Sequence, residues 1–282
     1  MDLFSVTTNN AASVALQTLT AVTTNEQATQ KQISTGYRVA DAKDDGAAFA
    51  VAQRVRSDVA SLTTANQQIG AASSLVGTTI TSLTDVSNTL ISIRSTMTDL
   101  ANGGLDSTSR SNYTAQLKQL VTQVSSYLAD STYNGKSLIG DVNGGTISSV
   151  VLVRNEVGTT YGIATWSGKS NVATSLASVT SSSLTSGYFQ TALATSGLIT
   201  NVANLVGTSL NNFGSISNYL NNQVSYNSDK IDTLNTGLGT LVDANLAQEA
   251  AQLAALQIQQ QLATQSLSLA NQAPSILLKL FQ

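Results

Sequence analysis

The six residues from Asp41 to Gly46, Asp-Ala-Lys-Asp-Asp-Gly, form the densest group of side chains in this chain that could do chemistry. Three carboxylates so close together suggest part of a calcium loop, because calcium prefers oxygen ligands. The spacing is wrong for such a loop, and Ala52 occupies the position that needs a bidentate glutamate. We therefore expect no metal here. We expect Asp44 and Asp45 to lie at the N-terminus of a helix, where negative charge is favourable.

The rest of the chain offers little reactive chemistry. It contains no histidine and no cysteine, which excludes disulfides, cysteine nucleophiles, histidine-dependent triads and the usual zinc sites. It has no Gly-x-Ser-x-Gly motif, and no strand pattern precedes the pair Gly237 and Gly239. We expect neither enzymatic activity nor a cofactor.

The composition points to a protein that is buried against other proteins. Only 10% of the residues are charged, whereas soluble domains carry about 25%. Serine, threonine, asparagine and glutamine supply the missing polarity, so such a surface can be covered without stranding many charges. This favours an assembly subunit, although a secreted polar protein would have the same composition. The net charge of −3 argues against nucleic acid as a partner, and no basic cluster exists to bind a membrane surface.

The first ten residues, Met1–Asn10, lack both the basic and the apolar region of a signal peptide. No apolar run reaches the length of a transmembrane span. We expect the protein either to stay in the cytoplasm or to leave by a route that does not read a cleaved leader.

The two ends of the chain predict helices that need a partner. Asp243–Gln282 carries apolar residues at three- and four-residue steps, with an almost uncharged polar face. Val6–Ile33 has the same character, with N-cap candidates at Thr7, Thr8, Asn9 and Asn10. An isolated helix is marginally stable in water, so we expect these two helices to pair with each other.

The interior of the chain predicts longer helices. Ala47–Leu100 sustains a heptad pattern and would be about 80 Å long, which indicates a coiled coil. A turn at Ala101–Ser107 leads to a helix at Ser109–Ala129, which we expect to be its antiparallel partner. Gly197–Leu241 predicts another long heptad helix. The expected fold is mainly α, a long antiparallel coiled-coil bundle with nested N- and C-terminal helices.

Between these helices lies a segment of different character. Val150–Val153 and Tyr161–Thr165 predict two strands. Ser167–Ser196 is rich in serine, threonine and glycine, and we expect it to be mainly β or irregular, and exposed.

Two motifs at opposite ends of the chain resemble bacterial flagellin. The first is Ile33–Val59, and the second is Leu241–Pro274, with Leu-Val-Asp-Ala-Asn-Leu-Ala-Gln-Glu at its start. The resemblance covers roughly residues 1–140 and 195–282, and departs from the family at Gly46, Phe49 and Asn245. The first motif falls on Thr35, Gly36, Arg38, Val39, Ala42, Lys43, Asp44, Asp45 and Ala50.

The resemblance implies a layered subunit. Residues 1–45 and 243–282 would form an inner coiled coil around a channel, residues 46–140 and 195–242 an outer helical layer, and residues 141–194 a short exposed insert. The motif residues Gly36, Arg38, Lys43, Asp44 and Asp45 would form the connector between the layers. The assembly core would comprise Leu16, Leu19, Ile33, Leu246, Leu253, Leu256, Leu267 and Leu277.

The resemblance also implies partners and a location. The chain would polymerise with identical or related flagellins into the helical filament used for swimming, outside the cell. It would pass the flagellar type III apparatus without a cleaved signal, with an export chaperone at its C-terminal helix, and would meet hook-associated and cap proteins. A hook–filament junction protein is an alternative, as is an adhesin or glycan-binding module in the insert, whose run Thr180–Thr185 could instead carry O-linked sugar.

The family also includes members recognised by a Toll-like receptor through the region Leu90–Gln116. Ser92 and Gln116 stand where recognised members carry arginine and glutamate, and Arg94 is retained. The resemblance therefore predicts weak recognition.

Overall fold

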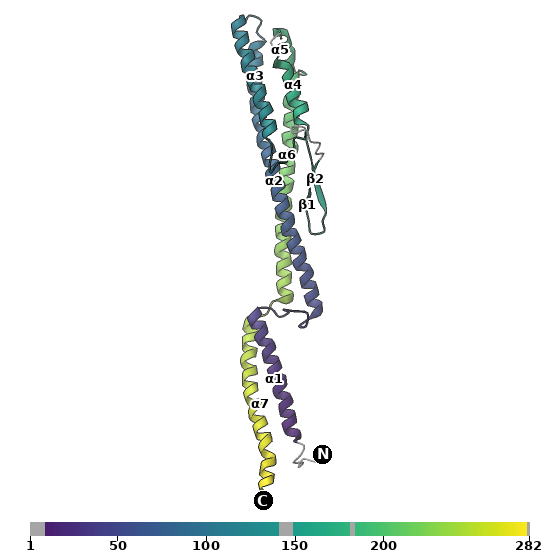
Figure 1. Ribbon diagram of the computed structural model, residues 1–282, viewed down its shortest axis with the longest axis vertical. Coiled ribbons are helices and arrows are strands. Elements are labelled where there is room, and N and C mark those ends of the chain that lie inside the picture. The colour runs from purple at the N-terminus through teal and green to yellow at the C-terminus, as the bar shows by residue number, and fades with distance from the viewer. Residues whose placement is uncertain (1–8, 141–148, 181–183, 281–282) are drawn as a thin grey trace. The chain divides into compact units, whose positions relative to one another are not determined.

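The computed structural model describes residues 9–140, 149–180 and 184–280 (Figure 1). The described part is dominated by long helices and confirms the mainly α fold expected from the heptads. The elements in chain order are α1 (Asn10–Thr35), α2 (Gly46–Leu100), α3 (Ser107–Asp130), β1 (Ser149–Val153), β2 (Thr160–Ala164), a π-helical turn (Lys169–Ala173), α4 (Thr174–Ala177), a 3-10 turn (Ser178–Thr180), α5 (Ser186–Leu193), α6 (Leu198–Val242) and α7 (Leu246–Leu280).

The chain forms two compact units. The first comprises Met1–Ser57 and Thr233–Gln282, and the second comprises Asp58–Asp232. Both boundaries fall inside helices, α2 and α6, and not at the connectors between helices. The predicted inner and outer layers concern packing between copies of the chain, so they remain a prediction.

The ends of α1 show why the helix spans these residues. The Asn9 side chain accepts a hydrogen bond from the Ala12 amide at 3.0 Å, which satisfies one of the free amides of the first turn. At the other end Gly36 adopts a left-handed conformation with φ of 73°, which glycine adopts without steric cost. Asn9 was one of the predicted N-caps, and the predicted first turn at Val6–Thr8 lies outside the described residues.

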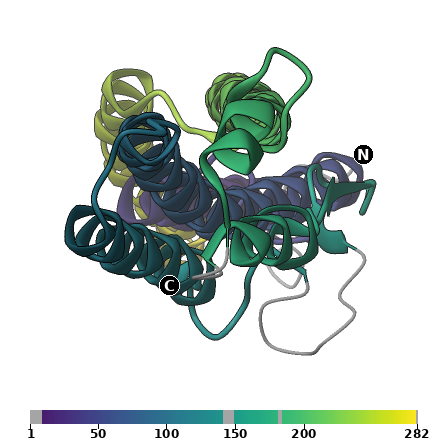
Figure 2. The same cartoon turned by 90° about the horizontal axis from the view of Figure 1, so that it is seen from above.

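The core of the second unit follows the heptads of its long helices. Figures 1 and 2 show α2, α3 and α6 running beside one another. From Leu62 to Leu100 a continuous stripe of buried residues on α2 follows steps of three and four, and Leu75, Thr89 and Thr96 are buried beside it, which confirms the coiled-coil pattern. The residues of the stripe are Leu62, Ala65, Ile69, Ala72, Val76, Thr79, Leu83, Val86, Leu90, Ile93, Met97 and Leu100. On α6 the matching buried positions are Ile199, Val202, Val206, Ser209, Phe213, Leu220 and Asn227.

A β-hairpin packs on this helical core. Strands β1 and β2 pair antiparallel, with Ser149 opposite Ala164 and Val153 opposite Thr160. Leu152 is buried on one strand and Ile163 on the other, and both belong to the main hydrophobic cluster. The two predicted strands are confirmed to within one residue at each end.

The prediction for Ser167–Ser196 is wrong. Its described residues are largely helical turns and the helices α4 and α5, and several of their side chains are buried in the core. Val172, Leu176 and Val179 are fully buried and follow steps of four and three, which is helical spacing. This apolar stripe is short, and the many serines and threonines around it make it hard to recognise in the sequence.

Candidate functional site: the paired terminal helices and their connector

Helices α1 and α7 pack along each other, as expected for the two ends of the chain (Figure 1). The interface is narrow: Val22 and Thr29 are buried on α1, and Leu256 and Ala263 are buried on α7. The flanking positions along the same face are half-buried. They are Ala12, Ala15, Leu19, Glu26 and Ile33 on α1, and Leu253, Gln260, Leu267 and Ala270 on α7.

Further apolar side chains of the pair are exposed to solvent. Leu16 is 54% exposed and Leu246 is 51% exposed, so these two residues of the predicted assembly core do not lie between α1 and α7. Ile258, Leu262 and Leu269 are also exposed on α7. The side chain of Leu277, another predicted residue, lies outside the described residues. The pair thus has one covered apolar face and additional uncovered ones.

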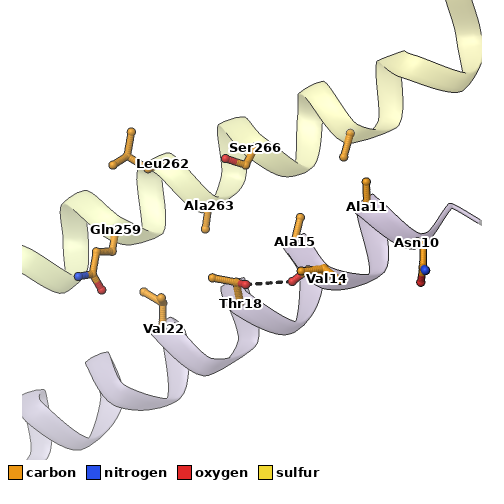
Figure 3. Close-up of a pocket in the computed structure, with 11 residues that line it drawn as sticks. Asn10, Ala11, Val14, Ala15, Thr18, Val22, Gln259, Leu262, Ala263 and Ser266 are labelled. Atoms are coloured by element: carbon orange, nitrogen blue, oxygen red, sulfur yellow. Dashed lines mark hydrogen bonds between the residues drawn. The ribbon is translucent and has the colours of Figure 1, made fainter. Parts of the chain in front are cut away.

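A shallow groove runs between the two helices (Figure 3). Its volume is about 780 Å³. None of the residues that line it is charged, and several are alanines, which do not fill the space between the helices. The lining consists of Asn10, Ala11, Val14, Ala15, Thr18, Val22, Gln259, Leu262, Ala263, Ser266 and Ala270.

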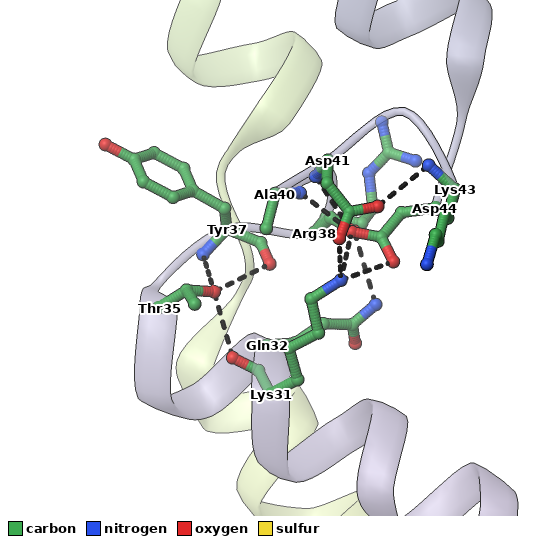
Figure 4. Close-up of polar contacts among 9 residues, drawn as sticks. All are labelled: Lys31, Gln32, Thr35, Tyr37, Arg38, Ala40, Asp41, Lys43 and Asp44. Atoms are coloured by element: carbon green, nitrogen blue, oxygen red, sulfur yellow. Dashed lines mark hydrogen bonds and ion pairs between the residues drawn. The ribbon is translucent and has the colours of Figure 1, made fainter.

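The connector between α1 and α2, residues 36–45, is held by one lysine (Figure 4). Lys31 Nζ lies 2.8 Å from Asp41 Oδ2 and 2.8 Å from Asp44 Oδ1. The hydrogen bonds to Asp41 and Asp44 raise the pKa of Lys31. The hydrogen bond from Lys31 in turn holds the pKa of each carboxyl group below its usual range.

The two aspartates at the end of the connector have different roles. Asp45 Oδ1 accepts hydrogen bonds from the amides of Ala47 and Ala48, each at 3.0 Å, so Asp45 caps α2 as predicted. Asp44 instead turns back and accepts hydrogen bonds from the amides of Ala40 and Asp41. Asp44 lies two residues before α2, and its side chain bonds Lys31 and the connector amides, not the first amides of the helix.

The connector is also joined to the far end of the chain. Arg38 Nη2 donates to the Leu241 carbonyl at 2.6 Å, and the Arg38 amide donates to the Val242 carbonyl at 2.7 Å. The Ala244 amide donates to the Gly36 carbonyl at 2.9 Å. A small apolar cluster of Val39, Ala48, Ala52 and Val242 lies in the same unit.

Part of this connector was predicted from the sequence. Gly36, Arg38, Asp44 and Asp45 were identified as motif residues, but no partner was predicted for Arg38 and no role for Lys31. Lys31 is one of the few charged residues of α1, and this rarity is the sequence feature that could have indicated a role for it. The predicted Lys43 contributes its backbone amide, which donates to Asp41 Oδ1 at 2.8 Å.

The predicted receptor-recognition residues lie at the surface of the second unit. Ser92 and Arg94 are exposed on α2, and Gln116 is exposed on α3. They lie apart in sequence from the terminal pair, so they form no part of the groove.

The described residues contain no group of three acidic, histidine or cysteine side chains that could hold a metal ion. None of the helices in the described part is long and apolar enough to cross a membrane. What the terminal pair offers is uncovered apolar surface with almost no charge, which favours association through burial.

Two family models match this chain. Residues 6–144 match the bacterial flagellin N-terminal helical region, and residues 196–281 match the bacterial flagellin C-terminal helical region. The chain is 28% identical over 286 residues to a flagellin of Brucella melitensis, with 99% of each chain covered. It is 29% identical over 318 residues to Flagellin C of Rhizobium meliloti, also with 99% of each chain covered.

A solved structure has a similar fold. It is described as a candidate flagellar hook-associated protein from Vibrio parahaemolyticus, with a TM-score of 0.58 and 17% identity. The match covers 71% of this chain and 100% of that one, and at this identity it shows the fold alone. The two family models and the full-length relatives go further: the chain belongs to the bacterial flagellin family.

Proposed function

We propose that this flagellin assembles into its filament through the α1–α7 pair, with the exposed apolar side chains of the pair covered by neighbouring subunits. As a flagellin, the chain is a structural subunit of the flagellar filament, an extracellular appendage, and it polymerises with related flagellin subunits. The observation that carries the proposal is the uncovered apolar surface of α7 at Ile258, Leu262 and Leu269.

Burial of this surface supplies a driving force for assembly. Each square ångström of apolar surface removed from water contributes about 25 cal/mol. Burying a charge costs much more than burying an amide or hydroxyl. Among residues 246–272, the part of α7 whose side chains the structure describes, Glu249 is the one charged residue. This helix can therefore be covered on several faces at low cost.

The layered arrangement belongs to the same proposal. Residues 1–45 and 243–282 would form the inner layer, residues 46–140 and 195–242 the outer layer, and residues 141–194 the short insert. The connector at Gly36, Arg38 and Asp44 would then set how one layer leads into the other. The Arg38 bonds to the end of α6 support this role.

Export and capping partners are also proposed. The exposed stripe of α7 is a suitable surface for a cytoplasmic chaperone that covers the C-terminal helix before the chain passes the type III apparatus without a cleaved signal. Hook-associated and cap proteins would contact the same terminal helices at the two ends of the filament. A pull-down of the export chaperone with full-length chain, and its loss after deletion of 245–282, would support the first of these.

A junction role would use the same terminal helices. Copy number distinguishes a filament subunit from a junction protein, because a filament contains thousands of subunits and a junction contains a single ring. The relatives that match over the full length are flagellins, so the filament role is favoured.

Weak recognition by the Toll-like flagellin receptor is the last part of the proposal. Ser92, Arg94 and Gln116 are exposed, so a receptor can reach them in the free chain. Strong signalling by purified monomer at a nanomolar dose would refute weak recognition. It would leave the assembly role intact.

Point substitutions on the uncovered stripe test the assembly proposal. We expect Leu262→Asn combined with Leu269→Asn to abolish filaments seen by negative-stain microscopy, because both side chains are largely exposed in the single chain. The monomer should keep its helical circular dichroism. The matched control, Gln257→Asn with Thr264→Asn, changes exposed polar residues of the same helix and should leave filaments intact.

Deletion of 245–282 gives a second test. We expect the truncated chain to form no filaments while its second unit, residues 58–232, stays folded. Normal filaments from either the stripe variant or the truncated chain would overturn the proposal.

A further inference from the structure

The turn of the β-hairpin lies against both long helices of the second unit through polar contacts. The Arg154 carbonyl accepts hydrogen bonds from Asn227 Nδ2 at 3.0 Å and from Gln223 Nε2 at 3.4 Å, both on α6. On the other side, the Val153 amide donates to Gln68 Oε1 of α2 at 3.2 Å. The hairpin therefore bridges α2 and α6 just where strand β1 ends.

Asn227 is the centre of this bridge. It is 0% exposed, and it occupies the apolar heptad position seven residues after Leu220. Its Nδ2 also donates to Asn66 Oδ1 of α2 at 2.8 Å, and its Oδ1 accepts from Gln223 Nε2 at 2.9 Å. Both amide hydrogens and the carbonyl oxygen are thus used, so the buried amide is satisfied in this arrangement.

Two charged contacts flank the amide cluster. Lys230 of α6 pairs with Glu156 in the hairpin turn, and the hydrogen bond from Lys230 lowers the pKa of the Glu156 carboxyl. Arg154 Nη1 donates to Tyr219 Oη at 3.2 Å. The turn is thereby bonded to four residues of α6: Tyr219, Gln223, Asn227 and Lys230.

The apolar heptads alone leave the pairing of α2 and α6 ambiguous. If one helix slid by seven residues, apolar positions would again face apolar positions. The amide cluster would not survive such a shift, because Asn227 would then face Val59 or Ser73 in place of Asn66. A buried amide without a full set of partners is costly, so the cluster discriminates against the shifted pairings.

The cluster is a poor means of gaining stability. Within the described residues, Arg154 Nε and Glu156 Oε2 are buried without a hydrogen-bond partner. Buried polar groups of this kind are often no more stabilising than apolar side chains of similar size. A single buried asparagine at a heptad position is known to fix the register of coiled coils at a cost in stability.

We infer that the hairpin turn at residues 154–156, together with the Asn66–Asn227 pair, sets the axial register between α2 and α6. The polar contacts of the hairpin, which we call the clip, make the native pairing of the two apolar stripes more stable than a pairing shifted by one heptad. The clip belongs to the fold of a single chain, so it stands whether or not the terminal helices drive assembly.

The absence of cysteine from the chain allows a direct test. Asn66 Nδ2 lies 3.5 Å from Ser228 Oγ, and Ser73 and Asn221 are the positions one heptad further along each antiparallel helix. Ser73→Cys with Asn221→Cys therefore reports the native register by disulfide formation. Ser73→Cys with Gly214→Cys, or with Ser228→Cys, reports a one-heptad shift in either direction.

The register variant is Asn66→Leu combined with Asn227→Leu. In dilute full-length monomer, we expect the ratio of shifted to native disulfide to rise about tenfold or more, because the penalty for a stranded amide is gone. The Tm should be equal or higher. The control variant, Asn88→Leu with Asn211→Leu, changes exposed asparagines of the same helices and should leave the disulfide ratio unchanged.

A second variant moves the partner amide. Val59→Asn combined with Asn66→Leu offers Asn227 an amide one heptad away, so the disulfide through Gly214→Cys should become favoured. This variant keeps an asparagine pair in the bundle and therefore guards against simple unfolding of the leucine variant. If the native disulfide alone forms in both backgrounds, the register is set elsewhere and the inference is wrong.

Discussion

The guanidinium of Arg38 donates a hydrogen bond to the backbone carbonyl of Leu241, 203 residues later in the chain. The neighbouring amides of Arg38 and Val39 both donate to the Val242 carbonyl. The connector after α1 is therefore bonded to the last residues of α6 through the Arg38 side chain and two backbone amides, and the Ala244 amide donates to the Gly36 carbonyl. These bonds hold the end of α1 close to the start of α7, in addition to the packing of the two helices.

Removing the Arg38 side chain should loosen this joint. We expect Arg38→Ala to lower the hydrogen-exchange protection of the Val39 and Ala244 amides about fivefold, the effect of losing one hydrogen bond of ordinary strength. Protection in the second unit should not change. The control Arg54→Ala removes an exposed arginine of α2 and should leave both amides as they are; equal loss in the two variants would contradict the role of Arg38.

Acid should weaken the ion pairs that Asp41 and Asp44 make with Lys31 in the connector. The hydrogen bond from Lys31 lowers the pKa of Asp41 and Asp44 from the ordinary value of 3.8. A carboxyl group whose pKa is lower in the folded chain stabilises it above the unfolded pKa, and this contribution is lost as the pH falls through the folded pKa. The contribution of these two ion pairs to the stability of the connector should therefore be complete above about pH 4 and should be lost as the pH falls further.

The same pairing raises the pKa of Lys31 from 10.5. Its contribution is complete below the unfolded pKa and disappears only as the pH rises through the folded value, so the ion pairs of Lys31 should also be lost in strong alkali. We expect Lys31→Met to move the carboxyl titrations of Asp41 and Asp44, followed by carbon NMR, to higher pH. Lys43→Met, a control beside them on the connector, should move them less; equal shifts would show that general charge and not the Lys31 contacts governs the titration.

The cap of α3 gives a third prediction. Asp106 accepts hydrogen bonds from the amides of Thr108 and Ser109, each at 2.9 Å, and the bond from the Ser109 amide is the main cause of its lowered pKa. Asp106→Ala should lower the urea midpoint at neutral pH, whereas Asp106→Asn should lower it less because asparagine also caps helices. The difference between wild type and Asp106→Ala should shrink as the pH falls below 3.8.

Asp99→Ala is the control for the cap, because Asp99 is exposed near the end of α2. Its effect on the urea midpoint should be small at any pH. A pH-independent loss in Asp106→Ala would show that the carboxylate is not the capping group.

Periodicity was sufficient to predict the long helices, because apolar residues recur every three or four positions along each of them. The stripe from Leu62 to Leu100 recurs every three or four residues, and no tertiary detail is needed to see it. Short helices are different. α4 spans Thr174–Ala177 and buries one residue, Leu176, which is too little for a pattern to emerge from a serine- and threonine-rich segment.

The site was harder to predict than the helices. A stripe of leucines indicates which residues are apolar, but it does not say which face a partner covers: in the single chain Leu256 is buried, whereas Leu16 and Leu246 are exposed. The contacts of Arg38 and Asn227 join segments separated by 203 and 161 residues. Such pairings depend on the register of the folded chain, which a single sequence does not display.

The narrow α1–α7 interface gives the last prediction. Leu256 is 7% exposed and Leu262 is 57% exposed on the same helix, so the two leucines form a matched pair. Leu256→Ala should lower the free energy of unfolding of the α1–α7 pair by about 2 kcal/mol, the low end for a buried leucine, because the interface around it is narrow. Leu262→Ala should change it by less than about 0.5 kcal/mol. The measurement is hydrogen exchange of the α1 amides in dilute monomer. In filament assembly Leu262 should matter more than Leu256. Leu262→Ala should raise the critical concentration for polymerisation by more than its effect on the stability of the monomer explains. Equal effects of the two variants on the monomer would show that α1 and α7 do not pair in the free chain.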